Sequence, residues 1–482
     1  MDYQNTYCNP LSLPDIPRGK DDWYPYEKEM FSHENKPDSV VGPDYRSISD
    51  PTVMYHDNKW YLYPSYGMAW VTEDFQHWKH VRTDPYCPKY SPAIIPWKGR
   101  FLLTSWCCPL YVSDGPLGPF ELLGDFFDTD GNHFTPCDPC LFADDDGRIY
   151  LYAFRFKELP DKEYNCCQIV GYELDADNPR QIIDGPNVIV EMNPRVRPWE
   201  RQGYHYQHKD FGWVEGPHLL KHNGRYYMIY ASAETEDPSY CMAVFFSDEG
   251  PLHGFKCQKR NPLTTHRHGI VGGTGHGCVE HGPNNSLWAF YTIAAPYAHM
   301  YERRIGMDPV EVDENGELFC PRGISDTPQY IPGYNMESPD YVNLTGWLRP
   351  KASSAKSGRD ALYATDESCL TFWQADDDDL QPTLVCDLMG RFTVGAVRLF
   401  WREVGLDYNS GAVPGPIRYR VEGLVNGEWR VLVERSDSEE EYNIDYRTFD
   451  EQCCTHVRLI ILEWPDGIHP AVIDFSVFGV RR

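Results

Sequence analysis

The stretch GWVEGPHLLKHNGRYYMIY, residues 212 to 230, places two apolar segments on either side of the polar turn KHNG. Asn-Gly between apolar segments is a strong signal for a β-hairpin. The pattern recurs every 41 to 77 residues, starting at Asp50 (DPTVMYHDNKWYLYPS), Ser91 (SPAIIPWKGRFLLTSW), Asp138 (DPCLFADDDGRIYLYA), Glu215 (EGPHLLKHNGRYYMIYAS) and, more weakly, Gly275 (GHGCVEHGPNNSLWAFYT).

A further strand with its own turn follows several of these hairpins, as in AWVTEDFQHWKHV, LYVSDGPLGPFELL and AVFFSDEGPLHGFK. Four short strands in each of five units are typical of a five-bladed β-propeller rather than a sandwich. No comparable helical periodicity occurs between Asp50 and Cys320. The sequence therefore predicts an all-β catalytic propeller over residues 1–335, with an N-terminal extension over 1–45.

The repeat ends near Met336, and a segment with a different pattern of short strands follows. These strands include TLVCDL, GAVRLFW, RYRVEGLV, EWRVLV, HVRLIIL and VIDFSVFG, with turn signals between them. Such spacing predicts a separate β-sandwich of the jelly-roll type over residues 336–482. We interpret the acidic run QADDDDLQP (374–382) as a solvated loop.

Composition restricts the partners of the chain. A formal charge of −28 over 482 residues argues against nucleic acid and anionic membranes, whereas neutral ligands such as sugars fit this charge. Sixteen cysteines include three vicinal pairs, which favour a reduced compartment over a disulfide framework. With no signal-peptide pattern visible, we expect a cytoplasmic protein, or a secreted or periplasmic one if a leader precedes these residues. The oligomeric state stays open.

The first residues of the repeats, here called the blade heads, converge on the axis of a propeller. We predict that the heads are Asp50, Ser91, Asp138, Glu215 and His276. Turn and cap chemistry explains any single one of the acids. Three carboxylates in five equivalent positions instead indicate a functional cluster, because carboxylates are seldom buried without a partner or a task.

Such a cluster suits glycoside hydrolysis with inversion. One carboxylic acid protonates the leaving oxygen, and a second carboxylate activates a water molecule on the opposite face of the sugar. Asp50 and Glu215 belong to blades that are not neighbours, which leaves room for that water. Asp138 then orients the sugar and raises the pKa of the acid by like-charge repulsion.

The motifs SDPTVMYHDNKWYLY, CDPCLFADDDGRIYLY and WVEGPHLLKHNGRYYMIY, followed by GGTGHGCV and RRIGMDPVEVDENGEL, resemble the family 43 glycoside hydrolases. The resemblance covers about residues 40–330 and implies an inverting five-bladed propeller. It implies that Asp50 is the general base, Asp138 the pKa modulator and orienter, and Glu215 the general acid.

The resemblance also extends to two residues of the fifth blade. His276 matches a family histidine that is often near a channel ion or water, although a hydrogen-bonded core histidine is an equal alternative. Arg303 best matches an arginine that helps to hold the substrate or the acid, with the adjacent Arg304 as the other register.

Aromatic and basic residues near the heads are candidates for sugar binding. Sugar rings stack on aromatic faces, so Trp106, Tyr206 and Trp213 are candidates, although core packing explains any single tryptophan more often. Arg155 follows the third hairpin and is a further candidate.

The sequence predicts no required cofactor and no specific metal site. His205 with His208, and His266 with His268, have metal-like spacing, but no third ligand is fixed, which argues against zinc. Residues 338–482 resemble discoidin-like modules of the coagulation factor 5/8 C-terminal type, which include family 32 carbohydrate-binding modules. That resemblance allows for a structural calcium ion and a sugar-binding appendage; a structural buttress is the alternative.

Three functions stay open from the sequence. The first is an inverting, exo-acting hydrolase of the α-L-arabinofuranosidase or β-xylosidase type that acts on oligosaccharides, with β-galactosidase or β-galactofuranosidase specificity as the alternative on the same scaffold. The second is a non-catalytic sugar-binding propeller, and the third is a related glycoside phosphorylase, which would need a cationic phosphate pocket.

Overall fold

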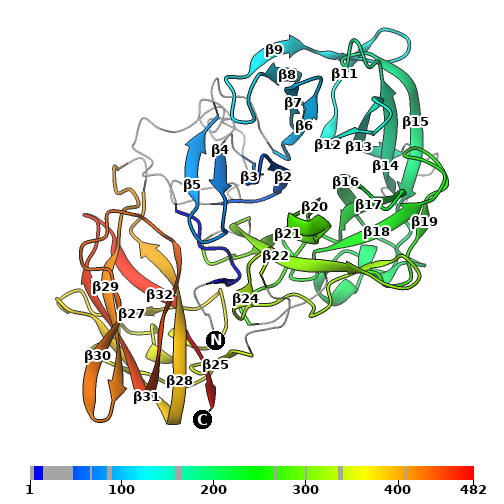
Figure 1. Ribbon diagram of the computed structural model, residues 1–482. Coiled ribbons are helices and arrows are strands. Elements are labelled where there is room, and N and C mark those ends of the chain that lie inside the picture. Colours follow the sequence, from blue (N-terminus) through cyan, green and yellow to red (C-terminus); the bar gives the residue numbers. More distant parts are fainter. Residues whose placement is uncertain are drawn as a thin grey trace.

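The structure is a computed structural model, built almost entirely from antiparallel strands (Figure 1). It describes residues 5–14, 47–65, 68–83, 90–157, 166–264, 269–298, 301–334, 340–407 and 410–481. Within these ranges the helical elements are short 3₁₀ turns, and none is long and apolar enough to span a membrane. None of the fifteen cysteines described forms a disulfide bond. His266, His268 and most of the extension 1–45 lie outside the described residues.

Five four-stranded sheets form the blades of a propeller. Blade 1 contains β2 (Thr52–His56), β3 (Lys59–Tyr63), β4 (Met68–Thr72) and β5 (Lys79–Arg82). Blade 2 contains β6 (Ala93–Trp97), β7 (Arg100–Thr104), β8 (Leu110–Ser113) and β9 (Glu121–Gly124). Blade 3 contains β12 (Cys137–Ala143), β13 (Ile149–Lys157), β14 (Cys166–Leu174) and β15 (Ile182–Glu191). The pair β10 (Phe126–Phe127) and β11 (His133–Phe134) precedes blade 3.

Blade 4 contains β16 (Val214–His222), β17 (Arg225–Ser232), β18 (Cys241–Ser247) and β19 (Lys256–Cys257). Blade 5 contains β20 (Gly277–His281), β21 (Leu287–Ala294), β22 (Arg303–Val312) and β23 (Leu318–Phe319). The inner strands β2, β6, β12, β16 and β20 contact one another in turn, and β20 contacts β2, which closes the ring. The predicted five-bladed architecture is thus confirmed.

The conformation of the hairpin turns explains why the sequence predicts the repeats. Asn223 and Gly224 have φ values of 52° and 80°, and Asp57 and Asn58 have φ values of 49° and 61°. Two consecutive residues with positive φ are the mark of a type I′ turn, whose twist matches that of the two strands. The predicted polar turns therefore join inner strands to their neighbours in blades 4 and 1.

Packing rather than a shared strand closes the ring between blades 5 and 1. Trp60 of blade 1 lies with its ring centre 5.6 Å from that of Phe290 of blade 5, within one buried cluster. The N-terminal segment adds Tyr7, Leu11 and Leu13 to this cluster. Its strand β1 (Thr6–Tyr7) pairs with β24 (Gln329–Tyr330), which follows blade 5.

A separate antiparallel sheet of eight strands contains the C-terminal residues. Three of its strands are long: β28 (Thr383–Val404), β31 (Ile444–Glu463) and β32 (His469–Arg481). The others are β25 (Val342–Asn343), β26 (Lys351–Ala352), β27 (Trp373–Gln374), β29 (Arg418–Val425) and β30 (Glu428–Glu434). Register shifts interrupt the pairing of the long strands, as bulges do when a sheet bends.

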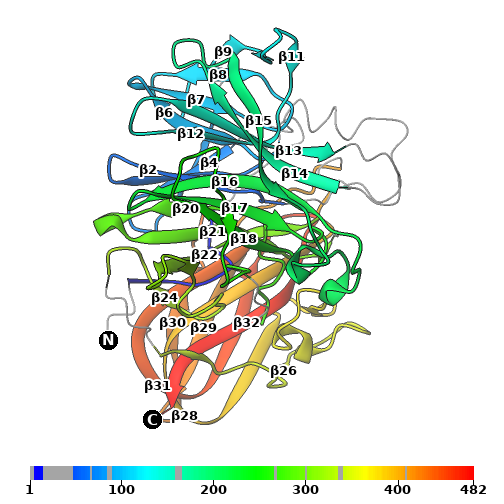
Figure 2. The same ribbon diagram turned by 90° about the vertical axis from the view of Figure 1, so that its right-hand side faces the viewer.

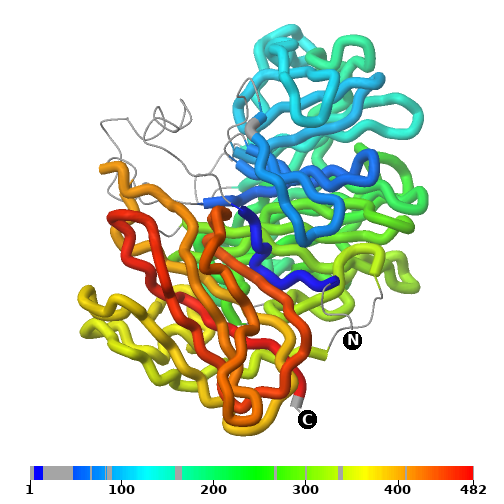
Figure 3. The backbone as a smooth tube through the Cα atoms, turned by 60° about the vertical axis from the view of Figure 1, so that its left-hand side comes forward, coloured from blue at the N-terminus to red at the C-terminus, as the bar shows by residue number. Residues whose placement is uncertain are grey.

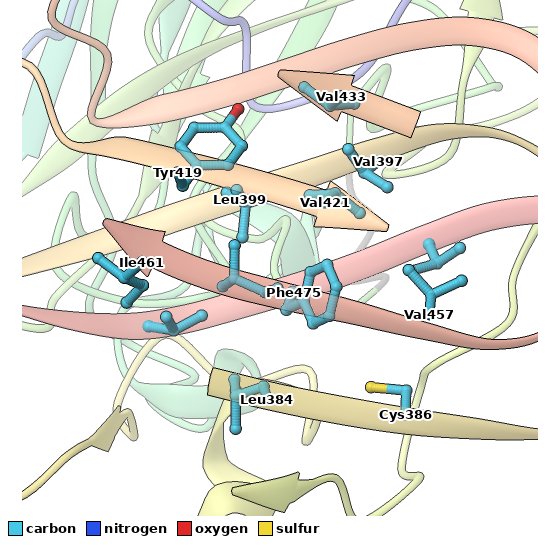
Figure 4. Packing of buried hydrophobic residues seen from close by; sticks show 14 of the residues in the cluster. Leu384, Cys386, Val397, Leu399, Tyr419, Val421, Val433, Val457, Ile461 and Phe475 are labelled. Carbon is cyan, nitrogen blue, oxygen red and sulfur yellow. The ribbon is translucent and has the colours of Figure 1, made fainter. Parts of the chain in front are cut away.

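Buried side chains from these strands meet in a core of their own. Figure 4 shows residues such as Leu399, Val421 and Phe475 pointing into a common interior from different strands. This core is distinct from the clusters between the blades. The arrangement is consistent with the predicted β-sandwich; the predicted boundary between residues 335 and 336 lies outside the described residues.

The C-terminal sheet packs closely on the propeller (Figure 2). Phe400, Ile444 and Ile473 belong to the same buried cluster as residues of blades 4 and 5. The N-terminal segment passes between the two parts (Figure 3) and bonds to both. Asn9 donates to the Met307 carbonyl at 2.9 Å, and Ser12 donates to the Ile444 carbonyl at 2.9 Å.

Candidate active site

The blade heads share an unusual backbone conformation. Asp50, Ser91 and Asp138 have φ values of 51°, 48° and 46°, and each precedes a proline. The corresponding residues of blades 4 and 5 are Gly216, with φ of 52°, and His276, with φ of 33°. The prediction that Glu215 occupies the equivalent position is therefore wrong by one residue, because glycine takes the left-handed conformation in blade 4 at the lowest cost.

Strand pairing explains how Glu215 still reaches the same place. Glu215 pairs with Ala231, after which the register shifts before His218. In blade 3 the same shift follows Cys137, the residue before Asp138. A bulge of this kind redirects the neighbouring side chains. Glu215 in blade 4 thus corresponds to Cys137 in blade 3.

Asp50 is buried and held by two hydroxyl groups. Ser49 and Ser65 donate hydrogen bonds to its Oδ2 at 2.9 and 2.7 Å. The backbone N–H of Asp50 donates to Thr292 Oγ1 at 2.9 Å. Burial alone would raise the pKa of the Asp50 carboxyl, but His276, Arg303 and the two serines outweigh burial, and the pKa is lowered. Asp50 is therefore a carboxylate in the neutral pH range.

Asp138 is partly buried, and its pKa is raised. Ser91 donates a hydrogen bond to its Oδ1 at 2.8 Å, and the backbone N–H of Gly216 also bonds to the carboxylate. Burial raises the pKa of Asp138, and the negative charge of Asp50 adds to that effect. Ser91, the head of blade 2, thus holds the acid of the next blade in place.

Glu215 is held by two hydrogen-bond donors, and its pKa is raised. Trp213 Nε1 donates to Oε2 at 2.6 Å, and the Tyr240 hydroxyl donates to Oε1 at 2.5 Å. Burial, followed by the charge of Asp138, raises the pKa of Glu215 to about 7. Glu215 therefore retains its proton over much of the range in which Asp50 has lost its own.

His276 joins the three acids. Its Nδ1 lies 3.5 Å from Asp50 Oδ1, and its charge lowers the pKa of Asp50, Asp138 and Glu215. A Cβ atom on Gly216 would come within 2.8 Å of the His276 ring. Glycine at 216 is therefore required by this close approach as well as by its φ.

Successive side chains of β22 point to opposite faces of the sheet, which distinguishes the adjacent residues Arg303 and Arg304. Arg303 is buried and its charge acts on both Asp50 and Tyr240. Arg304 points to the other side, where its Nε donates to Asn443 Oδ1 at 2.9 Å. Arg303 thus faces the acid cluster, and Arg304 faces the C-terminal sheet.

Aromatic side chains flank Glu215 and Asp138. Phe154 and Phe156 lie with ring centres 5.3 and 5.6 Å from that of Trp213. Trp106, which is 40% exposed, directly precedes Cys107, whose sulfur lies 3.6 Å from that of Cys137. Phe156 is 56% exposed, so that it and Trp106 offer apolar ring surface to solvent near the acids.

Two other predicted residues have structural contacts of their own. Arg155 donates two hydrogen bonds to Gln168 Oε1, at 3.1 and 2.9 Å, on the adjacent strand. The Tyr206 hydroxyl donates to the Ser239 carbonyl at 3.0 Å, beside Tyr240. Tyr206 thus supports the segment that carries Tyr240.

A cavity of about 470 Å³ lies along the inner strands, from Ser91 and His276 at the heads to His222 and His281 at the turns. His222 Nδ1 and His281 Nε2 are 3.1 Å apart at that end. Across the described residues, no three His, Cys, Asp or Glu side chains come together as a metal site. A channel ion and a structural calcium ion stay predictions of the sequence.

Several contributors were not found from the sequence. Tyr240, Ser65 and Thr292 each bond directly to an acid or its backbone. Ser65 follows strand β3 of blade 1 and Thr292 lies within strand β21 of blade 5, and neither belongs to a recognisable motif. Of the three, only Tyr240 has a local feature that could have suggested a role in the site, because it is an aromatic residue that follows the Asp-Pro turn of blade 4.

Comparison with known proteins identifies the family of the chain. A family model, "Glycosyl hydrolases family 43", matches residues 39–318. A "Xylosidase/arabinosidase" of Butyrivibrio fibrisolvens is 32% identical over 130 residues, which cover 27% of this chain and only 22% of that protein. A "Beta-xylosidase" of Xylanibacter ruminicola is 24% identical over 308 residues, covering 52% of this chain and 92% of that protein.

A solved structure supports the fold. The "thermostable family-43 glycoside hydrolase" is 20% identical and superposes with a TM-score of 0.52, covering 68% of this chain and all of that one. At that identity the likeness concerns the fold alone. The family model, by contrast, covers more than half of the chain and includes all three acids. The chain belongs to family 43 of the glycosyl hydrolases.

Proposed function

We propose that this chain is an inverting, exo-acting glycoside hydrolase of the α-L-arabinofuranosidase or β-xylosidase type. Asp50 serves as the general base, Asp138 as pKa modulator and orienter, and Glu215 as the general acid. The observation that carries the proposal is the opposite displacement of two pKa values: that of Asp50 is lowered, and that of Glu215 is raised to about 7. Environments that separate two carboxyl groups in this way assign base and acid.

The reaction needs one proton transfer at each carboxyl group. Glu215 donates its proton to the glycosidic oxygen as the bond to the anomeric carbon breaks. Asp50 accepts a proton from a water molecule that attacks the same carbon from the opposite face. Inversion of the anomeric configuration follows, and it requires carboxyl groups about 6.5–9.5 Å apart so that the water fits between them.

Asp138 and His276 set the working pH range of this pair. The charge of Asp138 raises the pKa of Glu215 and keeps the proton available, whereas His276 favours the ionised form of Asp50. The Ser91 hydrogen bond fixes the position of Asp138. Arg303 adds a positive charge on the Asp50 side and is a candidate donor to sugar hydroxyl groups.

Aromatic surface near Glu215 is suited to the sugar that leaves. Trp213 holds the acid through Nε1 and presents its ring beside Phe154 and Phe156. We infer that Phe156 and Trp106, both partly exposed, contact the sugar rings through their faces. Arg155 and Tyr206 then act by supporting neighbouring segments rather than by touching the sugar.

The names of the two curated relatives favour xylose or arabinose as the released sugar. A panel of nitrophenyl glycosides tests this: α-L-arabinofuranoside, β-xyloside, β-galactoside and β-galactofuranoside. Hydrolysis of either of the first two is expected, and preference for a galactose-type substrate would select the alternative specificity. Activity only when phosphate is present would indicate a phosphorylase, and binding without turnover of any substrate would indicate a sugar-binding propeller.

Exo action is tested separately with xylo- and arabino-oligosaccharides whose reducing ends carry a label. An exo-acting enzyme releases single sugars from the unlabelled end, so that labelled products shorten by one unit at a time. Early appearance of labelled fragments of mixed length would indicate endo action.

For the C-terminal residues we propose a structural role on the discoidin-like scaffold predicted from the sequence. Support comes from the shared buried cluster, which includes Phe400 and Ile473, and from the ring contact of Tyr297 with Phe400, whose centres are 5.3 Å apart. A glycan array probed with the full chain carrying Glu215→Gln tests the alternative. Binding that is lost on substitution of residues in 340–481, but not in the propeller, would favour a sugar-binding appendage.

A further inference from the structure

Two cysteines lie in contact beside Asp138. Cys107 Sγ and Cys137 Sγ are 3.6 Å apart, and both residues are partly exposed. The backbone N–H of Cys107 donates to the Pro136 carbonyl at 2.8 Å, which ties the two segments together. The two thiols are thus in contact, and closing a disulfide between them requires the sulfur atoms to approach to about 2.05 Å.

The pair is part of the surroundings of the proposed acids. Cys137 directly precedes Asp138 and corresponds in its bulge to Glu215 of blade 4. Trp106 is the residue before Cys107, and its ring is 40% exposed. A disulfide between Cys107 and Cys137 therefore shifts the chain next to Asp138 and next to Trp106, whose ring we infer to contact the sugar.

We propose that Cys107 and Cys137 form a reversible disulfide in the presence of a low-molecular-weight disulfide oxidant, and that this bond lowers the hydrolytic activity. The activity part of this proposal rests on the proposed function; bond formation itself does not.

The chemistry is a pair of thiol–disulfide exchanges. Burial, then the neighbouring sulfur of Cys107, raises the pKa of Cys137 to about 12, so that Cys137 stays protonated at neutral pH. The thiolate of Cys107 attacks the oxidant, here oxidised glutathione, forming a mixed disulfide and releasing one glutathione thiolate. Cys137 then attacks the Cys107 sulfur, gives up its proton and releases the second glutathione as the thiol. Two protein thiols are oxidised, and one disulfide is reduced to two thiols.

Closure of the bond shortens the distance between the sulfur atoms from 3.6 Å to about 2.05 Å. The displacement acts next to Asp138, whose position depends on the hydrogen bonds from Ser91 and from the N–H of Gly216. Misplacement by about 1 Å is enough to cost an enzyme on the order of 100-fold in rate. The reduced cysteines thus leave Asp138 in the position described above, whereas a disulfide between them displaces Asp138.

The test uses the full chain with oxidised glutathione at neutral pH, followed by alkylation and peptide mass mapping without reduction. We expect a Cys107–Cys137 cross-linked peptide, a loss of two free thiols, and a fall in kcat/KM of about 10- to 100-fold that dithiothreitol reverses. Absence of the cross-link, or a cross-link that leaves kcat/KM unchanged, would overturn the proposal.

Cys107→Ser is the informative variant, because serine is close in size and Cys107 itself bonds to none of the three acids. It should keep its basal activity and lose less than about twofold on oxidation, within the range of ordinary surface substitutions. Cys453→Ser, on the C-terminal sheet, serves as the matched control and should respond like the unaltered chain. Equal inactivation of Cys107→Ser contradicts the assignment. If the unaltered chain hydrolyses no glycoside, the proposed function fails while mass mapping still decides whether the bond forms.

Discussion

Tyr240 donates a hydrogen bond from its hydroxyl to Oε1 of Glu215 at 2.5 Å. This bond favours the ionised carboxylate, whereas burial and the charge of Asp138 favour the protonated acid. The resulting pKa of about 7 predicts that kcat/KM falls as the pH rises through neutrality, because Glu215 then loses the proton that it must donate. This fall is the basic limb of the pH profile of kcat/KM, and two substitutions should shift its midpoint in opposite directions.

Tyr240→Phe should shift the basic limb of kcat/KM to higher pH. The ionised form of Glu215 loses a donor, and a hydrogen bond to a charged group contributes about 1.5–3 kcal/mol, which corresponds to about one pH unit or more. The measurement is a pH profile from about pH 4 to pH 9. Tyr227→Phe is the control, because its hydroxyl donates to the Gly316 carbonyl at 2.9 Å. A limb that stays in place in Tyr240→Phe contradicts the assignment of that limb to Glu215.

Asp138→Asn should shift the same limb to lower pH and lower the rate. Removal of the negative charge reduces the repulsion that keeps Glu215 protonated, and the lost orientation costs on the order of 100-fold in kcat/KM. The pH profile is measured with an oligosaccharide at raised enzyme concentration, because its leaving group needs the proton of Glu215. A purely structural role of Asp138 would lower the rate and leave the limb where it is.

Arg303→Gln should raise the pKa of Asp50 and move the acidic limb upward by up to about one unit, because a nearby positive charge is lost. Arg304→Gln is the matched neighbour. Its guanidinium group bonds to Asn443, so the acidic limb should stay fixed while the denaturation midpoint falls. The reverse pattern would exchange the roles of the two arginines.

Arg398→Ala should destabilise the protein by about 3–5 kcal/mol, because it leaves Asp474 buried without its partner. Arg398 is 1% exposed, donates from Nε to Asp474 at 3.0 Å, and donates from another nitrogen to the Asp326 carbonyl of the propeller side at 2.7 Å. Urea denaturation measures the effect. Arg391→Ala, on the exposed part of the same strand, is the control; equal midpoints would show that Arg398 does not join the two parts.

The sequence predicted the architecture because the hairpin turns and the Pro-containing heads are local signals that recur. It predicted Asp50, Asp138 and Glu215 for the same reason. It placed Glu215 one residue out of register, since only the observed φ of Gly216 reveals which residue turns the chain. Arg303 and Arg304 are adjacent and chemically alike, so only the strand alternation in the folded chain distinguishes them.

Longer-range features could not be read from local patterns. Ser65, Tyr240 and Thr292 reach the acids from positions 15 to 242 residues away. On the C-terminal side, TLVCDL and GAVRLFW were interpreted as separate strands, whereas both belong to the bent strand β28. Its register shifts interrupt the periodicity that a single strand would show.

The central claim is that Glu215 protonates the leaving group. The most direct test compares Glu215→Gln with the unaltered chain on two substrates that share one sugar, an oligosaccharide and a dinitrophenyl glycoside. Only the oligosaccharide has a leaving group that needs a proton, and general acid catalysis contributes about 10²–10⁴-fold. The account predicts a loss of that size on the oligosaccharide and a far smaller loss on the dinitrophenyl glycoside. Equal losses on the two substrates would contradict it.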